Sequence, residues 1–248
     1  MKTIYVLWER QLKRYYRSKV RMIASLAQPL LFLVAFGFGF GPIYNKASGG
    51  NYIDFLVPGI IAMSVLFSST FMGIEVIWDR QFGFLKETLV APVSRFKIML
   101  GRTLGGATVA TFQGLIVLLL SMIIGFRPKS IESVILSIFF MALIAIIFTA
   151  LGTAIASQLE DMHAFQLIIN FLIMPLFFLS GALFPLQGVP KFITVLSSIN
   201  PLSYGVDALR GAMTGNLHFG LIFDAVVLSG VAVLFLSIGA YFFSKIEA

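Results

Sequence analysis

Six long apolar segments constrain this sequence more than any other feature. They cover residues 22–41, 55–77, 104–126, 134–156, 165–184 and 221–243. The hydrocarbon core of a bilayer is about 30 Å thick, and a helix needs about 20 apolar residues to cross it. Lipid offers no partner to an unpaired backbone N–H or C=O, so such segments must be helical. The sequence therefore predicts an all-α integral membrane protein with six transmembrane helices in one domain, residues 1–248.

The composition excludes several other classes of protein. Hydrophobic residues make up 58% of the chain and charged residues 12%, which is far from a soluble globular composition. The net charge of +7 comes from Lys and Arg at the flanks of the apolar segments, so we expect no nucleic-acid partner. The chain has no cysteine, and His163 and His218 are isolated from each other. We therefore expect no metal site and no catalytic residues.

The positive charges also predict the orientation of the chain. Seven Lys and Arg lie in residues 1–21, five in residues 78–103 and one near the end of the chain. The segments on the opposite side of the membrane contain five. Lys and Arg concentrate in cytoplasmic loops, so both termini are expected in the cytoplasm. Pro29 and Pro175 fall inside the first and fifth apolar segments, where neighbouring helices can satisfy the freed carbonyls. We expect kinks there rather than helix ends.

Residues 1–21 have the pattern of a helix that lies in the membrane interface. Arg10, Arg14, Arg17 and Arg21 are spaced i, i+4, i+7 and i+11, and aromatic residues such as Trp8 fall mostly on the opposite face. This pattern predicts arginines directed at anionic lipid phosphates and rings at headgroup depth. The alternative is a basic flank without a helix.

The loop of residues 79–102 is too long for a tight turn and too apolar for a solvated one. Phe82, Leu85 and Leu89 are spaced i, i+3 and i+7, which predicts a short helix with these three side chains on one face. Pro92 would end that helix, and Ser94 would cap the next one. A compact helix joined to two membrane helices suits a lever, but the same pattern fits an amphipathic connector resting on lipid.

Residues 185–220 also carry helix signals. Pro190 can open one short helix, and Asn200 followed by Pro201 at the first helical position can open another. The second helix would place Leu202, Gly205, Val206 and Leu209 on one face. The alternative is a surface loop with incidental helices.

Two of these segments resemble a known family, the ABC-2 type permeases, and within it the daunorubicin-resistance type of drug and lipid exporters. The first match runs from Asp79 to Arg102 and includes the stretch Leu-Val-Ala-Pro-Val-Ser-Arg at residues 89–95. The second is Asn-Pro-Leu-Ser-Tyr-Gly-Val-Asp-Ala-Leu-Arg at residues 200–210. A softer match is Phe-Leu-Val-Pro-Gly at residues 55–59. The resemblance covers nearly the whole chain in order and spacing.

This resemblance implies a permease of the plasma membrane that works as a dimer with a second copy or a related permease. Two copies of a separate ABC ATPase would bind ATP and Mg²⁺ and dock on a coupling helix at residues 80–92, and re-entrant helices at residues 185–220 would close the outer side. The sequence has no G-x-x-x-x-G-K-[ST], so this chain has no P-loop of its own. The residues implied are Arg80, Gly83, Leu85, Glu87, Leu89, Pro92 and Arg95 for coupling, Trp8, Arg10, Arg14 and Arg17 for the bracing interfacial helix, and Asn200, Pro201, Tyr204, Asp207 and Arg210 for the outer gate.

Other polar residues within the apolar segments are candidates for the pathway, for dimer contacts or for contacts between helices. Glu75 and Asp224 are ionisable residues near helix ends, and Gln166 and Asn170 are spaced i, i+4 on the fifth segment. The expected function is export of an amphipathic drug-like or lipid-like substrate by alternating access. The alternatives are a secondary transporter driven by an ion gradient and an intramembrane enzyme. Inverted repeats and midplane charge pairs, expected of the first, are not evident, and the second lacks a catalytic cluster.

Overall fold

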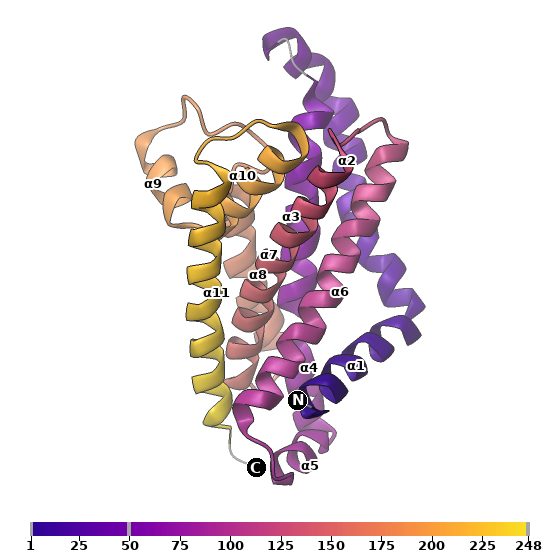
Figure 1. Ribbon diagram of the computed structural model, residues 1–248, viewed down its shortest axis with the longest axis vertical. Helices are drawn as coiled ribbons and strands as arrows, with labels where there is room; N and C mark the ends of the chain where they lie inside the picture. The colour runs from indigo at the N-terminus through magenta and orange to yellow at the C-terminus, as the bar shows by residue number, and fades with distance from the viewer. Residues whose placement is uncertain (1, 49–50, 247–248) are drawn as a thin grey trace.

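The computed structural model describes residues 2–48 and 51–246, which form helices and no strand (Figure 1). The helices are α1 (Lys2–Arg17), α2 (Lys19–Ser48), α3 (Tyr52–Phe71), α4 (Ile74–Gln81), α5 (Phe84–Val90), α6 (Arg95–Ile123), α7 (Ile131–Ser157), α8 (Met162–Phe178), α9 (Lys191–Ile199), α10 (Pro201–Thr214) and α11 (Leu221–Ser244). Within these residues, five stretches are long and apolar enough to cross a membrane: Lys19–Tyr44, Tyr52–Gln81, Arg95–Ile123, Ile131–Ser157 and Leu221–Ser244.

The helices form a bundle in which α3, α6 and α7 are central. The share of buried residues in the most apolar part of a span differs between the spans. It is 72% in Tyr52–Gln81 but only 17% in Lys19–Tyr44 and in Leu221–Ser244. Helices α2 and α11 are therefore peripheral. Helix α5 lies near the C-terminus at one end of the bundle, and α9 and α10 lie at the other (Figure 1). We refer to these as the α5 end and the α10 end.

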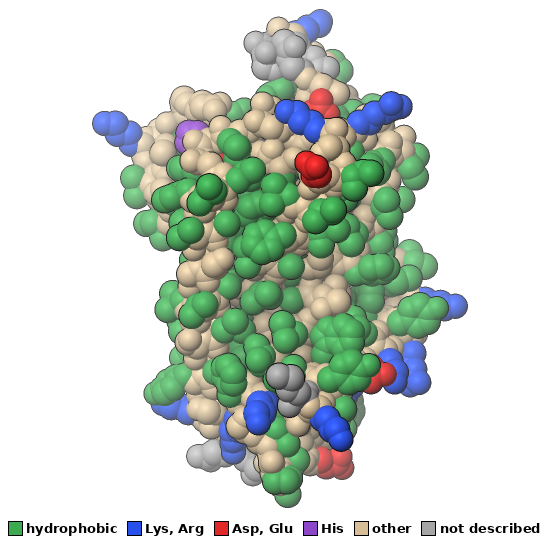
Figure 2. All heavy atoms as spheres, viewed as in Figure 1, with side chains coloured by type: hydrophobic (Ala, Val, Ile, Leu, Met, Phe, Trp, Pro, Cys, Tyr) green, Lys and Arg blue, Asp and Glu red, His purple; other side chains and the backbone are tan. Residues whose placement is uncertain are grey.

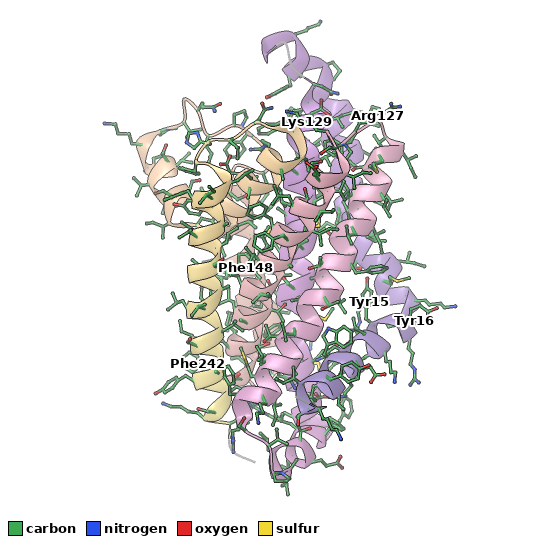
Figure 3. All side chains as sticks on the ribbon, viewed as in Figure 1. Tyr15, Tyr16, Arg127, Lys129, Phe148 and Phe242 are labelled. Atoms are coloured by element: carbon green, nitrogen blue, oxygen red, sulfur yellow. The ribbon has the colours of Figure 1, made fainter. Side chains whose placement is uncertain are left out.

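The surface has the charge distribution of a membrane protein. Apolar side chains cover the middle of the visible face, and blue and red side chains gather towards the two ends (Figure 2). Arg127 and Lys129 mark the α10 end, and Tyr15 and Tyr16 lie at the end of α1 that is farther from α5 (Figure 3). An apolar band between two charged ends matches the polarity of a bilayer.

Glycines allow the central helices to approach each other closely. A Cβ atom on Gly73 would lie 2.3 Å from the backbone of Gly152, and one on Gly152 would lie 2.3 Å from the carbonyl oxygen of Thr70. The predicted second span is interrupted at this crossing, where α3 ends at Phe71 and α4 begins at Ile74. Small residues at such crossings let membrane helices pack by backbone contact.

Helix α6 uses its glycines on two faces. Gly106 lies against Thr149 of α7 and Gly114 against Val65 of α3, so these glycines serve close packing between the central helices. Gly101 and Gly105 face α1 instead, and a Cβ atom on Gly105 would lie 2.7 Å from the side chain of Gln11. Helix α1 is therefore packed directly on α6.

The fifth predicted span, residues 165–184, has the wrong boundaries. Helix α8 ends at Phe178, and its 17 residues extend about 26 Å at about 1.5 Å per residue. The chain then turns at Gly181, whose φ is +74°. The next residue, Ala182, packs so closely on Gly59 that a Cβ atom added to Gly59 would lie 2.2 Å from the Ala182 carbonyl oxygen. The irregular backbone is buried in protein, which membrane proteins tolerate. Both internal prolines, Pro29 and Pro175, lie within continuous helices as expected.

The loop of residues 79–102 differs in detail from its prediction. Gly83 has a φ of +78°, and α5 begins only at Phe84, so Phe82 lies outside the helix and does not share a face with Leu85 and Leu89. Helix α5 ends at Val90, two residues before Pro92. Ser94 occupies the N-cap position of α6 but makes no side-chain capping hydrogen bond.

The segment of residues 185–220 matches its prediction more closely. Helix α9 follows Pro190, and the side chain of Asn200 accepts a hydrogen bond from the N–H of Leu202 at the start of α10. The predicted apolar face of α10, residues Leu202, Gly205, Val206 and Leu209, is buried. Helix α10 packs on α3, α7 and α11.

Candidate functional site

Two carboxylates of α4 lie in the middle of a group of arginines at the α5 end. Glu75 and Asp79 are one helical turn apart and both are buried. The guanidinium of Arg10 donates to both oxygens of Asp79, at 2.9 and 3.1 Å, and the buried Arg102 donates to Asp79 as well. We call Glu75, Asp79, Arg10, Arg14, Arg21 and Arg102 the arginine–carboxylate cluster.

The other two arginines of the cluster bridge α1 and α2 to α4. Arg14 lies 3.5 Å from Asp79 and 3.7 Å from Glu75, and Arg21 lies 3.3 Å from Glu75. Four guanidinium groups face two carboxylates, so the cluster has a formal excess of positive charge. A single ion pair at the surface contributes little to stability. Removing one partner of a buried ion pair is strongly destabilising, because the other charge is left unpaired.

Aromatic rings lie over three of the four guanidinium groups of the cluster. The Arg10 guanidinium lies 3.7 Å from the ring centroid of Phe84, the first residue of α5. Arg14 and Arg21 lie 5.1 and 5.2 Å from Trp78. Such cation–π contacts add about 0.5–2 kcal/mol each, depending on exposure. Helix α5 is thereby connected to α1 through Phe84 and Arg10.

The predicted direction of the arginine stripe in residues 1–21 is wrong for most of its members, and Arg21 belongs to α2 because α1 ends at Arg17. Arg10, Arg14 and Arg21 point to α4 rather than to lipid, and only Arg17 is exposed. A helix was predicted correctly in this segment, because a helix that lies in the membrane interface and a helix that packs on protein have the same spacing of polar and apolar residues. Trp8 donates a hydrogen bond to the Thr108 hydroxyl of α6 at 3.0 Å rather than standing free at the surface.

The flanks of α5 are anchored by two of the predicted coupling residues. Arg80 donates to the carbonyl oxygens of Ser157 and Leu159, at 2.8 and 3.0 Å, where α7 ends. Arg95 donates to the carbonyl oxygen of Ser244 at 3.2 Å and to that of Ile246, where α11 ends. Leu85 is buried beneath α5. These three residues attach α5 to the bundle, and none of them offers an exposed side chain to a partner.

The outer face of α5 remains uncovered by this chain. Phe82 is 81% exposed and Val90 80% exposed, and the side chains of Lys86, Glu87 and Pro92 are exposed beside them. Exposed large apolar side chains at a charged end of a protein make this face a candidate for contact with a partner. A groove along α1 adjoins this face, with Phe82 and Phe84 on one side and Glu9 and Lys13 on the other.

At the α10 end, the predicted gate residues hydrogen-bond to backbone groups of loops and helix ends. The carboxylate of Asp207 accepts hydrogen bonds from the backbone N–H groups of His218 and Phe219, at 2.9 to 3.1 Å. Asn200 donates to the carbonyl oxygen of Leu176 at 2.6 Å, and the Tyr204 hydroxyl donates to that of Ser198 at 2.7 Å. Pro201 opens α10 at its first turn.

Arg210 joins α10 to α3 and to the turn after α8. Its guanidinium donates to the carbonyl oxygens of Phe55 and Gly181, at 3.3 and 3.0 Å, and lies 3.9 Å from the Phe55 ring centroid. Burial lowers the pKa of Arg210 to about 10, so it is still a cation at neutral pH. Arg210 thereby gives the Gly181 carbonyl, which lies outside any helix, a hydrogen-bond donor.

Two further predicted residues stay on the surface. Gln166 and Asn170 are both exposed on α8, although α8 is an apolar helix. Asp224 is buried at the first turn of α11, and neither of its oxygens has a hydrogen-bond partner within the described residues. Neither fact assigns these residues a role by itself.

Sequence reasoning missed Asp79 and Arg102 as the centre of the cluster. Two signals could have found them: Glu75 and Asp79 are spaced i, i+4 at the end of an apolar segment, and Arg102 precedes another. Within residues 2–48 and 51–246, no group of three or more His, Cys, Asp and Glu is arranged to hold a metal ion.

Comparisons with known proteins agree on the class of this chain. Residues 2–214 match the family model described as ABC-2 type transporter. The chain is 31% identical over 210 residues to a ycf38 transport permease of Cyanophora paradoxa, covering 84% of this chain and 72% of the relative. It is 27% identical to nodulation protein J of Sinorhizobium fredii, over 94% of this chain and 90% of the relative. It is also 27% identical to the inner membrane transport permease YadH of Escherichia coli K12, over 93% and 88%. The chain therefore belongs to the ABC-2 type transporter family, as a membrane-spanning permease subunit, and this family implies partnering with an ABC ATPase.

Proposed function

We propose that this chain is half of a dimeric exporter in the plasma membrane and moves an amphipathic drug-like or lipid-like substrate outward by alternating access. The α5 end would face the cytoplasm with both termini, and two ATPase subunits would dock there, one on each copy. ATP and Mg²⁺ would be held by the ATPase. Helix α8 would be the sixth span, and α9 and α10 would be re-entrant helices that close the outer side.

The observation that carries this proposal is the contrast between the exposed outer face of α5 and its anchored flanks. Phe82, Glu87 and Val90 are free to meet a partner, whereas Arg80 and Arg95 attach the flanks of α5 to the ends of α7 and α11. A partner that moves α5 would therefore move several membrane helices together. The arginine–carboxylate cluster extends that connection to α1, α2 and α6.

The proposal is tested by co-expression with candidate ABC ATPases. We expect one ATPase to co-purify and to hydrolyse ATP, and Glu87→Lys to lower its association or its stimulated activity at least fivefold. Glu132→Lys is the matched control, because Glu132 is an exposed acidic residue at the far end of α7. Equal effects of the two variants would contradict a docking role for α5.

Transport itself separates this proposal from the secondary-transporter alternative. In vesicles that contain the purified chain and its ATPase, uptake of a lipid-like or drug-like compound should require ATP. Uptake by the permease alone, driven by an ion gradient and indifferent to the ATPase, would show that the alternative is correct.

The dimer is proposed from the polar residues that α8 exposes. An amide side chain facing hydrocarbon without a partner is costly, so Gln166 and Asn170 are better placed against a second copy or an aqueous pathway. The chain has no cysteine, so single-cysteine variants are clean reporters. We expect Asn170→Cys to give a disulfide-linked dimer in membranes and Ser229→Cys, exposed on α11, to give none; the reverse result would place the dimer contact on α11.

A further inference from the structure

A cavity of about 340 Å³ lies between α2 and the core of the bundle, near the α5 end. Its walls come from α1, α2, α3, α4 and α6, with Tyr15 and Arg21 at the junction of α1 and α2 and Pro29 two turns further along α2. Ligand cavities in proteins usually measure about 300–1,000 Å³. We call this space the α2 cavity.

Three polar atoms in the wall of the α2 cavity have no hydrogen-bond partner within the described residues. They are the hydroxyl oxygens of Tyr15 and Ser64 and Oε1 of Gln113, in residues that are 6%, 1% and 2% exposed. Gln113 donates through Nε2 to the carbonyl oxygen of Ser25 at 3.1 Å, so Oε1 remains as an acceptor. A buried polar atom without a partner costs about 1–3 kcal/mol.

The unpaired hydroxyl of Ser64 differs from that of several other residues in the long apolar helices. Thr70 donates to the carbonyl oxygen of Leu66 at 2.7 Å and Thr111 to that of Ala107 at 2.8 Å, each one turn earlier, whereas Ser64 makes no such bond. That bond is available to helical serines in general. Ser64 instead lines a space that a ligand can occupy.

The rest of the wall joins a cationic end to an apolar body. Arg21 lines the cavity beside Trp78, while Met63, Phe67 and Phe71 supply apolar surface. Burial raises the pKa of the Tyr15 phenol, which keeps that hydroxyl protonated beside Arg21. A few waters would satisfy Ser64 and Gln113 but not fill a mostly apolar space of this size.

We propose that the α2 cavity binds one lipid-like molecule whose polar group carries both a hydrogen-bond acceptor and a donor, with its hydrocarbon chain against Met63, Phe67 and Phe71. Acceptor oxygens would meet Arg21 and the Ser64 hydroxyl, and a donor would meet Oε1 of Gln113. This inference deepens the proposed function and rests on it for the class of ligand. A resident membrane lipid and a transported molecule share this chemistry, and the experiment below separates them.

The test uses the fluorescence of Trp78, which lines the cavity. The chain has two tryptophans, so Trp8→Phe leaves Trp78 alone. The full-length chain is placed in nanodiscs without ATPase or nucleotide and titrated with a lysophosphatidylethanolamine brominated on its acyl chain. We expect saturable quenching of Trp78. Ser68→Phe, at the half-buried rim of the cavity, should weaken apparent affinity at least tenfold, and the matched Ser229→Phe on α11 should leave it unchanged.

Gln113→Leu keeps the size of the side chain and removes the acceptor, so it tests the polar contact separately. We expect this substitution to weaken the apparent affinity for the lysolipid at least threefold and to leave quenching by a brominated alkane unchanged. Circular dichroism and gel filtration check that each variant folds. Quenching that rises linearly with probe and is equal in Ser68→Phe and Ser229→Phe would overturn the proposal, as would equal affinities for Gln113→Leu and the unaltered chain.

Mass spectrometry of the purified chain separates the two sources of ligand. A lipid that co-purifies at one copy per chain, and is lost in Ser68→Phe, would identify a resident lipid and would also explain absent quenching. Reversible lysolipid binding without such a lipid would identify a transported or entering molecule. Because the assay contains no ATPase, its failure would leave the docking and transport tests of the proposed function unaffected.

Discussion

The two ends of this bundle are stabilised in different ways. At the α5 end, side-chain charges join separate helices, since Asp79 and Glu75 of α4 meet arginines of α1, α2 and α6. At the α10 end, single charged side chains bind backbone groups, since Asp207 accepts from two N–H groups and Arg210 donates to two carbonyl oxygens. The first arrangement connects helices that can move as a unit. The second fixes the course of loops and turns.

The largest expected effect comes from breaking the arginine–carboxylate cluster. Asp79→Ala leaves Arg102 buried without its carboxylate, which should destabilise the protein by about 3–5 kcal/mol. Unfolding in detergent micelles measures the change. Glu9→Ala is the control, because its pair with Lys13 is exposed and worth under about 0.5 kcal/mol. If Asp79→Ala costs no more than Glu9→Ala, the cluster does not stabilise this end.

A double substitution sharpens the same point. Asp79→Leu with Arg102→Met replaces both charges by apolar groups and should recover most of the stability that either single change removes, because neither charge is left unpaired. A double variant as unstable as the sum of the singles would show that the two residues act independently.

The next effect concerns the packing of α1 on α6. Gly105→Leu places a side chain where Gln11 already lies 2.7 Å from the Cβ position, and overpacking of this kind costs about 1–3 kcal/mol. Proteolysis of α1 in detergent should become faster at the same time. Gly230→Leu has open space around its Cβ position and should change neither measurement.

At the α10 end, Asp207→Ala should have a smaller and more local effect. The N–H groups of His218 and Phe219 lose their acceptor, which costs about 1–3 kcal/mol. Hydrogen exchange of residues 216–220 should accelerate at least tenfold, while exchange in α1 stays the same. Acceleration at both ends would show that the two ends are coupled more tightly than their contacts indicate.

The smallest expected effect depends on pH. Hydrogen bonds from the backbone N–H groups of His163 and Ala164 lower the pKa of the exposed Asp161 carboxyl. A lowered pKa means that the capped start of α8 is stable above the pKa that Asp161 has in the unfolded chain. This stabilisation is lost as the pH falls through the folded pKa. A carbon NMR titration should place the midpoint of Asp161 below that of an unfolded aspartate, and a midpoint at or above that value would contradict this cap.

Much of the fold could be predicted from the sequence because membrane helices are specified locally. Lipid enforces the helix and its length, so the segments that became α2, α3 with α4, α6, α7 and α11 were visible as apolar runs. The helix starts at Lys191 and Pro201 were equally local, since a proline or an asparagine cap is read from neighbouring residues. The early end of α8 could not be predicted from neighbouring residues, because it depends on how the backbone of Ala182 packs on Gly59.

The candidate site divides in the same way. The sequence by itself determined that the chain is a bundle of apolar helices with a basic helix at its start and a short helix in the loop between residues 79 and 102. Only the tertiary structure decided that Arg10, Arg14 and Arg21 turn inward to Glu75 and Asp79, that Arg80 and Arg95 anchor α5, and that Ser64 and Gln113 lack partners in the α2 cavity. The physical reason is that periodicity fixes which residues share a helical face, but the neighbour that a face meets comes from elements distant in the chain.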